Sequence, residues 1–332
     1  MSQGGKHVLV TGGAGYIGSH AAKALAAKGF VPVVYDNLIY GHRWAVQWGP
    51  FVEGDIRDRA KLISTVRDHE IEAIMHFAAF TYVGESVARP ERYFNNNVIG
   101  SLALFDAAIE TGVRHVVFSS SAAIYGIPDR APISEEAPQS PINPYGETKL
   151  IVERALHWYG AAHGITWTAL RYFNAAGADP GGQLGEDHLP EAHLIPLVLQ
   201  AVLTGKAVDV YGSDYPTRDG TCVRDYIHVT DLADAHVAAL EYLLNGGASV
   251  ALNLGAGRGY TVLEVIQTAQ AVTGREAPYR IVERRPGDPD VLIADPGRAE
   301  RILSWRPQRS TLESIVASAW AWHAQPAKAT PR

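Results

Sequence analysis

A short apolar run at residues 6–11 breaks into the glycine-rich stretch GGAGYIG at residues 12–18, and a helical pattern follows up to Lys28. Strand, glycine turn and helix N-terminus in this order form a setting that binds a dinucleotide pyrophosphate. The glycines let the backbone approach the pyrophosphate, and the helix end offers free N–H groups. Gly12, Gly15 and Gly18 are therefore candidate cofactor-binding residues.

A carboxylate follows the next predicted strand. Residues 31–35 form an apolar run that delivers Asp36, eighteen residues after Gly18. A carboxylate at that strand end can accept hydrogen bonds from both hydroxyls of an adenosine ribose, and it would repel a 2′-phosphate. The sequence therefore favours NAD over NADP. A third predicted strand at residues 51–52 leads to Asp55, which we expect beside the adenine amino group.

Tyr145 and Lys149 are the candidate catalytic pair, because they stand four residues apart on the first turns of a predicted helix. This spacing puts the phenol and the ammonium on one face, where the positive charge is expected to lower the phenol's pKa from about 10. The pair would then act as a general base. Ser121 ends an apolar strand at the sheet edge where open α/β folds bind ligands, so its hydroxyl can relay or share the proton.

Strands and helices alternate up to residue 174, which predicts an α/β fold with a doubly wound parallel sheet, as in Rossmann domains. Glycines and prolines become frequent at residues 175–190, which is typical of a lobe boundary and a binding loop. We expect a nucleotide-binding domain at residues 1–174, with a return segment near residues 223–245. A smaller mixed α/β substrate lobe is expected at residues 175–332.

Composition argues against several classes of protein. A net charge of −6 with mixed signs argues against a nucleic-acid surface, and no apolar run approaches the roughly 18 residues of a membrane span. Cys222 is the only cysteine, which excludes an intramolecular disulfide and suits a reducing compartment. The first strand begins by Lys6, so no targeting peptide is expected and the predicted location is the cytoplasm.

One loop carries residue types that bind metals elsewhere, namely Glu186, Asp187, His188, Glu191 and His193. Their spacing fits no standard helical metal site, and the neighbouring prolines and glycines indicate a loop. The sequence therefore predicts no bound metal.

Nine short blocks together carry a resemblance to a known family. They are VTGGAGYIGS at residues 10–19, GDI at 54–56, VGES at 83–86, FSSSA at 118–122, Tyr145-Gly146 with Lys149, RYFNAAG at 171–177, YPT at 215–217, VRDYIHV at 223–229 and NLGAG at 253–257. From about Lys6 to Trp322 the chain resembles the extended short-chain dehydrogenase/reductase family, and within it the UDP-sugar 4-epimerases. The resemblance implies reversible, NAD-dependent inversion at C4 of UDP-glucose and UDP-galactose through a transient 4-keto intermediate.

Carried over position by position, the resemblance also implies a set of site residues. The implied NAD contacts, added to the glycines above, are Tyr16, Ile17, Asp36, Asn37, Asp55, Ile56, Phe77, Ala78, Asn97, Tyr145, Lys149 and Phe173. The implied UDP-sugar contacts are Ser121, Asn174, His193, Leu194, Tyr211, Arg224, Arg285, Asp288 and Leu292. Arg224 and Arg285 would face the diphosphate, and Tyr211 would lie by the uracil.

The chain departs from the family pattern at three positions. Thr81 stands where some members have lysine, so a contact near the cofactor is expected to be missing. Ala123 replaces a hydroxyl residue, which puts more of the proton sharing on Ser121. Leu292 occupies the position that helps decide whether an N-acetyl group at sugar C2 fits, where many strict members have tyrosine.

Several activities remain open on the sequence. A UDP-pentose (xylose or arabinose) 4-epimerase needs the same chemistry, and a bifunctional UDP-GlcNAc/UDP-GalNAc 4-epimerase differs in pocket size. A 4,6-dehydratase is disfavoured because Ala122 and Ala123 supply no acid pair beside Ser121. A non-catalytic NAD-binding sensor is disfavoured because Ser121, Tyr145 and Lys149 occur together.

The resemblance further implies a homodimer that pairs the helices expected at residues 90–111 and 145–163. Two such helices from each subunit would make a four-helix seam. The residues expected in this seam are Leu102, Phe105, Ile109, Leu150, Ala155 and Trp158.

Overall fold

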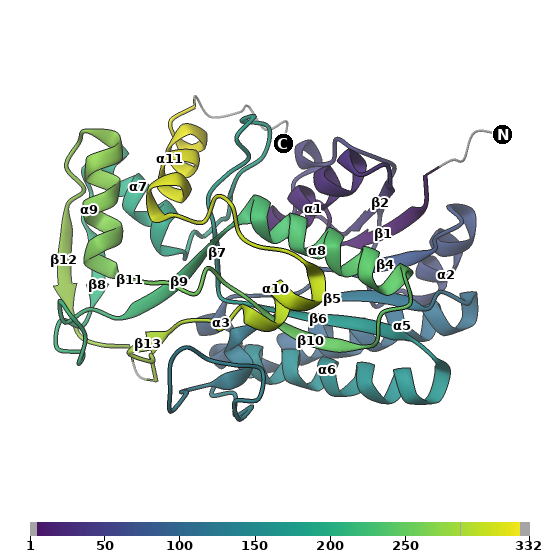
Figure 1. Ribbon diagram of the computed structural model, residues 1–332. Helices are drawn as coiled ribbons and strands as arrows, with labels where there is room; N and C mark the ends of the chain where they lie inside the picture. The colour runs from purple at the N-terminus through teal and green to yellow at the C-terminus, as the bar shows by residue number, and fades with distance from the viewer. Residues whose placement is uncertain (1–4, 286, 326–332) are drawn as a thin grey trace.

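The computed structural model describes residues 5–285 and 287–325 (Figure 1). Its largest element is a seven-stranded sheet in which every neighbouring pair is parallel. In spatial order the strands are β10 (Val250–Leu254), β6 (Thr166–Tyr172), β5 (His115–Ser121), β4 (Ala73–His76), β1 (His7–Thr11), β2 (Val31–Asp36) and β3 (Phe51–Glu53). The order reverses between β1 and β4, where doubly wound folds bind their ligands. The predicted doubly wound parallel sheet is confirmed.

Helices cover both faces of this sheet, because alternate residues of each strand point to opposite sides. Val8 and Val10 pack into one core cluster, whereas Leu9 between them packs into the other. The helices of the first cluster are α1 (Tyr16–Ala27), α8 (Val229–Leu244) and α10 (Gly297–Leu303). Those of the second are α2 (Arg59–Asp68), α5 (Gly100–Thr111) and α6 (Pro144–His163). In the described part of the chain, no helix is both long enough and apolar enough to cross a membrane.

A second, smaller lobe lies at one end of the sheet, on the left of Figure 1. It has a core of its own, formed between three helices and short strands. One small sheet contains β7 (Asn174–Ala176), β9 (Val223–His228), β11 (Gly259–Thr261) and β13 (Val291–Leu292), and a second pairs β8 (Val208–Tyr211) with β12 (Tyr279–Val282). The helices are α7 (Leu194–Thr204), α9 (Val262–Thr273) and α11 (Leu312–His323).

The return of the chain to the large sheet is longer than expected. The predicted return segment near residues 223–245 contains α8, which packs in the same core cluster as α1. Two later elements also return to the large sheet, because β10 pairs with β6 and α10 packs in the cluster of α1 and α8. The division into residues 1–174 and 175–332 stays a prediction. Its outer ends, residues 1–4 and 326–332, lie outside the described residues.

The long helix expected at residues 90–111 is divided into three parts. Helix α4 (Pro90–Tyr93) follows the short α3 (Val83–Ala88), a π-helical turn spans Phe94–Ile99, and α5 continues from there. The π-helical turn carries the three asparagines, whose mid-helix position predicts a specific partner. Asn97 has one, because its side chain accepts from the Phe80 N–H at 2.8 Å and donates to the Phe80 carbonyl at 3.0 Å.

The expected composition of the four-helix seam was partly wrong. Phe105 and Leu150 are 0% and 2% exposed, since they pack inside the subunit rather than outward. Trp158, which was expected in the seam, is 69% exposed, and Ile99, which was not among the expected residues, adds apolar surface with 55% exposure. A helix of this sandwich can be apolar on the side that covers its own sheet, so an apolar stripe alone does not identify the outer face.

Candidate active site

The turn between β1 and α1 is shaped to hold an anionic group. Gly12 has a φ of 73°, and a Cβ there would lie 2.6 Å from the Ala78 nitrogen, so only glycine fits. A Cβ on Gly18 would lie 2.2 Å from the Gly12 carbonyl oxygen, which brings helix and turn into close contact. Helix α1 begins after Gly15, which has no side chain to cap it, and its first turn has no acidic residue. The free N–H groups therefore fit a pyrophosphate.

Asp36 lies at the end of β2, next to this turn, and is buried. Its two carboxylate oxygens accept hydrogen bonds from the backbone N–H groups of Ala14, at 3.0 Å, and Leu38, at 2.8 Å. Burial raises the pKa of Asp36, and these N–H groups partly oppose the rise. The carboxylate is thus held in place beside the glycine turn, where it has further acceptor capacity for ribose hydroxyls.

Asp55 follows β3 and has a strong partner within the chain. The Arg57 guanidinium binds both of its oxygens, at 2.8 and 2.7 Å, and holds the pKa of Asp55 down at about 2. The Asn37 side chain donates to the same carboxylate at 3.3 Å. Asn37 and Asp55, predicted separately, are therefore neighbours, and their contacts with an adenosine stay a prediction.

Ser121, Tyr145 and Lys149 come together at the carboxyl edge of the sheet. Ser121 is the last residue of β5, and its Oγ accepts from the Ala123 N–H at 3.1 Å, which fixes the hydroxyl. Tyr145 and Lys149 lie in the first two turns of α6, which Asn143 caps. The Lys149 Nζ lies 5.8 Å from the centroid of the Tyr145 ring. Helical spacing alone therefore placed the two functional groups correctly on one face.

The pKa of Tyr145 is raised, whereas the sequence predicts that it is lowered. Burial raises it, and a hydrogen bond with Ser121 only partly opposes the rise. Burial also lowers the pKa of Lys149 to about 7, against the pull of Glu153. The prediction that Lys149 lowers the pKa of the Tyr145 phenol was wrong for the protein without its ligands. Both side chains are buried, and the loss of hydration has a larger effect on each pKa than the opposite charge.

A buried ion pair lies beneath these groups. The Arg171 guanidinium on β6 contacts the Glu153 carboxylate of α6 through Nε at 3.0 Å and a terminal nitrogen at 2.6 Å, and both side chains are buried. The Ser120 hydroxyl also donates to Glu153, and Arg171 donates to the Tyr125 hydroxyl at 2.9 Å. This network ties α6 to β5 and β6, so it fixes the helix that carries Tyr145 and Lys149.

An aromatic group surrounds the Tyr145 ring. Phe80 and Tyr93 form a buried cluster with it, and Tyr40 packs against them with its ring centroid 5.5 Å from that of Phe80. Tyr82 in turn lies edge-on to Tyr40 at 5.4 Å. The sequence analysis missed these four aromatic residues as neighbours of the site, because they come from three separate segments with no common spacing.

The predicted substrate residues of the second lobe mostly have partners within the chain. A terminal Arg224 nitrogen donates to Asp288 at 2.7 Å, and the Arg285 guanidinium lies 3.7 Å from the centroid of the Tyr211 ring. Arg224 and Arg285, both predicted to face the diphosphate, therefore already have partners within the chain, and their contacts with a UDP-sugar stay a prediction. Asn174 uses its side-chain amide to bind the Asp225 carbonyl at 2.9 Å.

Leu292 joins the second lobe to the catalytic edge. It lies beside Arg224 in the β13–β9 pairing and packs, partly buried, against the apolar cluster that contains Ala122, next to Ser121. Phe173 packs against the same cluster. The predicted size-selecting residue therefore packs against the cluster that contains the segment directly after the predicted catalytic serine. Thr81, the other departure on this side, is exposed.

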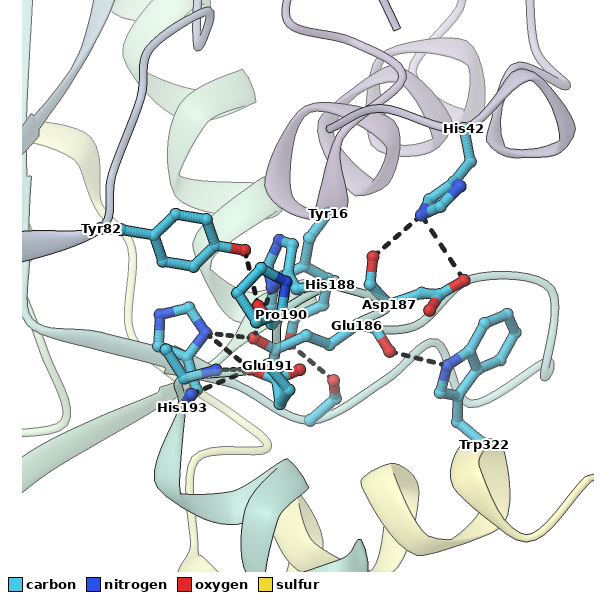
Figure 2. A network of polar contacts seen from close by, with 12 residues as sticks. Tyr16, His42, Tyr82, Glu186, Asp187, His188, Pro190, Glu191, His193 and Trp322 are labelled. Carbon is cyan, nitrogen blue, oxygen red and sulfur yellow. Dashed lines mark hydrogen bonds and ion pairs between the residues drawn. The ribbon is translucent and has the colours of Figure 1, made fainter. Parts of the chain in front are cut away.

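Four residues of the predicted loop meet in one cluster. Glu186, His188, Glu191 and His193 bring their side-chain N and O atoms within 4.8 Å of one another, whereas Asp187 turns away toward His42 (Figure 2). The contact between His193 Nδ1 and a Glu186 oxygen is 2.5 Å. Two ligands on a tetrahedral zinc would be roughly 3.4 Å apart, so this contact is too close for two ligands of one zinc ion and is instead a short hydrogen bond. The sequence identified these residues as a group, but their spacing did not predict which of them contact one another.

Comparisons with known proteins agree with this geometry. A model of the NAD dependent epimerase/dehydratase family matches residues 8–255. A UDP-glucose 4-epimerase of Rhizobium leguminosarum bv. trifolii is 54% identical over 322 residues, which are 97% of this chain and 98% of that protein. The structure of a UDP-glucose 4-epimerase from Brucella ovis in complex with NAD is 52% identical, with a TM-score of 0.93 over 95% of this chain and 97% of that one. A UDP-glucose-4-epimerase from Stenotrophomonas maltophila, solved with bound NAD and formylated UDP-arabinopyranose, is 43% identical, with a TM-score of 0.93 over 96% and 97% of the two chains.

Proposed function

This chain belongs to the NAD dependent epimerase/dehydratase family, and we propose that it interconverts UDP-glucose and UDP-galactose by reversible 4-epimerisation. The observation that carries the proposal is the meeting of Ser121, Tyr145 and Lys149 at the carboxyl edge of the sheet, in a chain that matches UDP-glucose 4-epimerases over nearly its whole length. The enzyme is an isomerase whose sugar passes through a 4-keto intermediate.

Tyr145 takes the proton of the sugar's 4-hydroxyl, and Ser121, hydrogen-bonded to the phenol, shares that proton. Burial disfavours an isolated charge on either Tyr145 or Lys149, so the phenolate and the ammonium form together as a pair whose opposite charges offset the lost hydration. NAD, when bound, supplies the acceptor for the C4 hydride and returns the hydride to the sugar. The keto sugar turns over about its link to the diphosphate before Tyr145 gives the proton back.

The residues proposed to hold NAD surround the glycine turn and the catalytic edge. The free N–H groups of α1 bind the pyrophosphate, and Asp36 binds the adenosine ribose. The full proposed set is Gly12, Gly15, Tyr16, Ile17, Gly18, Asp36, Asn37, Asp55, Ile56, Phe77, Ala78, Asn97, Tyr145, Lys149 and Phe173.

Most of the residues proposed to hold the UDP-sugar belong to the second lobe, whereas Ser121 lies at the end of β5 in the large sheet. Arg224 and Arg285 present guanidinium groups to the diphosphate, and Tyr211 lies by the uracil. The full proposed set is Ser121, Asn174, His193, Leu194, Tyr211, Arg224, Arg285, Asp288 and Leu292.

A product analysis tests the activity. Purified protein is incubated with UDP-galactose, UDP-GalNAc and UDP-arabinopyranose in separate reactions, and the nucleotide sugars are resolved chromatographically. We expect UDP-glucose to form fastest. If UDP-arabinopyranose is epimerised and UDP-galactose is not, the protein is a UDP-pentose 4-epimerase. If none of the three is converted, the proposed activity is wrong.

The N-acetyl substrates should be accepted weakly because of Leu292. Leucine lacks the outer ring atoms and the hydroxyl of a tyrosine, so space remains beside the sugar C2 near Ser121. A pocket that differs by a few carbons discriminates by about 1 to 3 kcal/mol, so kcat/KM should favour UDP-galactose over UDP-GalNAc by roughly 10- to 200-fold. We expect Leu292→Tyr to abolish the UDP-GalNAc reaction and to spare UDP-galactose, and Leu292→Ala, which enlarges the pocket, to increase UDP-GalNAc turnover. Absence of UDP-GalNAc turnover at high enzyme concentration, or a tyrosine variant like the wild type, would exclude Leu292 as the gate.

We also propose a homodimer in the cytoplasm. The location is supported by the single cysteine, Cys222, which suits a reducing compartment. The dimer is supported by exposed apolar side chains on neighbouring helical segments, Trp158 on α6 and Ile99 just before α5.

Sedimentation at micromolar concentration should therefore give a dimer. Trp158→Glu should raise the dimer dissociation constant at least tenfold, because it places a charge in the seam. Ile281→Glu is the matched control, since Ile281 is 55% exposed on β12 in the other lobe. A monomeric wild type, or equal effects of the two variants, would contradict the proposed seam.

A further inference from the structure

Glu186 is a buried carboxylate that is not among the proposed NAD or UDP-sugar contacts. It is 3% exposed, although a buried carboxylate is costly unless it is paired. Its partners are two imidazoles, since one of its oxygens lies 2.5 Å from His193 Nδ1 and 3.2 Å from His188 Nδ1 (Figure 2). Although burial opposes ionisation, the imidazoles lower the pKa of Glu186 to about 2, so the carboxylate is charged at neutral pH.

Three separate parts of the protein hold the loop around Glu186 in place. The Trp322 Nε1–H donates to the Glu186 carbonyl at 3.0 Å, His42 Nε2 bonds to the Asp187 carbonyl at 2.9 Å, and the Tyr82 hydroxyl donates to the Pro190 carbonyl at 3.0 Å. These anchors come from α11, from the loop after Asp36 and from the loop after Phe80. The Glu186 carboxylate is thus positioned by the fold before any ligand binds.

His193 is held in an orientation that leaves one ring edge open. It is the N-cap residue of α7, and its Nδ1 faces Glu186 at 2.5 Å and Glu191 at 3.5 Å. The side chain is nevertheless 49% exposed, so the edge opposite Nδ1, with Nε2, is the accessible one. A positive charge at a helix N-terminus is disfavoured by the helix dipole, and the two carboxylates offset that cost.

The charged neighbours of His193 favour imidazolium. Although the partial desolvation of the ring beside the loop opposes the charge, Glu186 and then Glu191 raise the pKa of His193 to about 10. The remaining titratable groups around these carboxylates are His188, whose ring centroid lies 5.5 Å from that of His193, together with Asp187, Tyr16, Tyr82 and His323. Burial and the two glutamates raise the pKa of Tyr16, and burial lowers that of His323. Tyr16 and His323 are therefore both neutral at neutral pH and add no charge beside His193.

We propose that Glu186 is a positioning residue for substrate: it fixes the His193 ring as an imidazolium whose free Nε2–H faces the substrate and binds the UDP diphosphate. This inference rests on the proposed function, which places His193 among the UDP-sugar contacts, and it adds the group that sets the charge and direction of that contact. Arg224 and Arg285 would bind the diphosphate from the second lobe, and His193 would bind it from the N-terminus of α7.

The test is UDP binding by calorimetry between pH 6 and 8.5 on NAD-loaded enzyme. Glu186→Gln keeps a hydrogen-bond acceptor but removes the charge, so His193 should titrate near the ordinary value of about 6.5. At each pH the Kd of the variant is divided by the Kd of the wild type, which removes the contribution of UDP's own titration because that contribution is the same for both proteins. We expect that ratio to stay within about threefold at pH 6 and to reach about tenfold at pH 8. Asp187→Asn, which removes a carboxylate of the same loop that faces His42, should give a ratio near one throughout.

A second measurement does not depend on UDP. Imidazole NMR of the free protein, with the His193 signal assigned from a His193→Gln variant, should show a charged ring through pH 9 in the wild type and a titration near pH 6.5 in Glu186→Gln. A wild-type His193 that is neutral at pH 8, or a Kd ratio that does not change with pH, overturns the proposal. So does stoichiometric binding of Zn²⁺ by the wild type that Glu186→Gln abolishes, because the cluster would then be a metal site. Failure of the proposed function has a different signature, namely no conversion of UDP-galactose by an enzyme whose His193 titrates as expected.

Discussion

Replacing Tyr145 with phenylalanine should lower the turnover of UDP-galactose by roughly 10² to 10⁴, the range for loss of a positioned acid or base. The substitution removes the phenol oxygen that takes the 4-hydroxyl proton but keeps the ring that packs with Phe80 and Tyr93. The fold, the NAD content and the Kd for UDP should therefore change little. Steady-state kinetics together with UDP calorimetry measure both parts of the prediction, and the loss should appear in kcat rather than in UDP affinity.

Tyr159→Phe is the matched control for this experiment. Tyr159 lies on the same helix, and its hydroxyl donates to Asp106 at 2.8 Å, at a part of the helix that the proposed mechanism does not use. Removing that hydroxyl should leave kcat within about twofold. Near-normal turnover in Tyr145→Phe would show that the proton goes to another group, and an equal loss in both variants would point to damage to α6.

The parts of the site that follow from local geometry could be predicted from the sequence. The i,i+4 spacing of Tyr145 and Lys149 fixes their common face as soon as the segment is helical, and the glycine turn fixes its own backbone. Asp36 follows from the strand that precedes it. In each case the relevant neighbours are within a few residues along the chain, so the pattern and the structure describe the same contacts.

Contacts between distant segments could not be predicted in this way. Glu186 meets His193 through a loop without periodic spacing, and anchors from Trp322, His42 and Tyr82 determine where that loop lies. The direction of the Tyr145 pKa depends on burial by side chains from other segments, which no i,i+4 argument contains.

Two of the residues expected in the dimer seam, Phe105 and Leu150, are buried for a related reason, whereas the dimer itself stays a prediction. Apolar periodicity identified helices with a hydrophobic side, but it did not show whether that side covers the subunit's own sheet or a partner. Phe105 turned out to cover the sheet, whereas Trp158 faces outward. Only the strand order, with α2, α5 and α6 sharing one face, separates the two possibilities.

The second large effect is expected from Glu153, whose loss should destabilise the fold. Glu153→Gln keeps the side-chain volume but leaves the Arg171 guanidinium, 4% exposed, without its counter-charge. Breaking one partner of a buried ion pair typically costs about 3 to 5 kcal/mol, because the remaining charge stays desolvated. The apparent free energy of unfolding in urea should fall by that amount. Turnover should fall as well, since the pair fixes α6 against β5 and β6 and the Glu153 charge helps keep Lys149 protonated.

Two controls separate this effect from the loss of an ordinary salt bridge. Glu72→Gln removes the partner of Lys6, an exposed pair, and should change the free energy of unfolding by less than about 1 kcal/mol. The double variant Glu153→Met with Arg171→Met removes both charges, and it should recover much of the stability because no buried charge is left unpaired. If Glu153→Gln unfolds at the same urea concentration as the wild type, the pair does not hold α6. If the double variant is no more stable than the single one, the unpaired charge does not explain the loss. Packing then explains it, together with the hydrogen bonds that Ser120 donates to Glu153 and Arg171 donates to Tyr125.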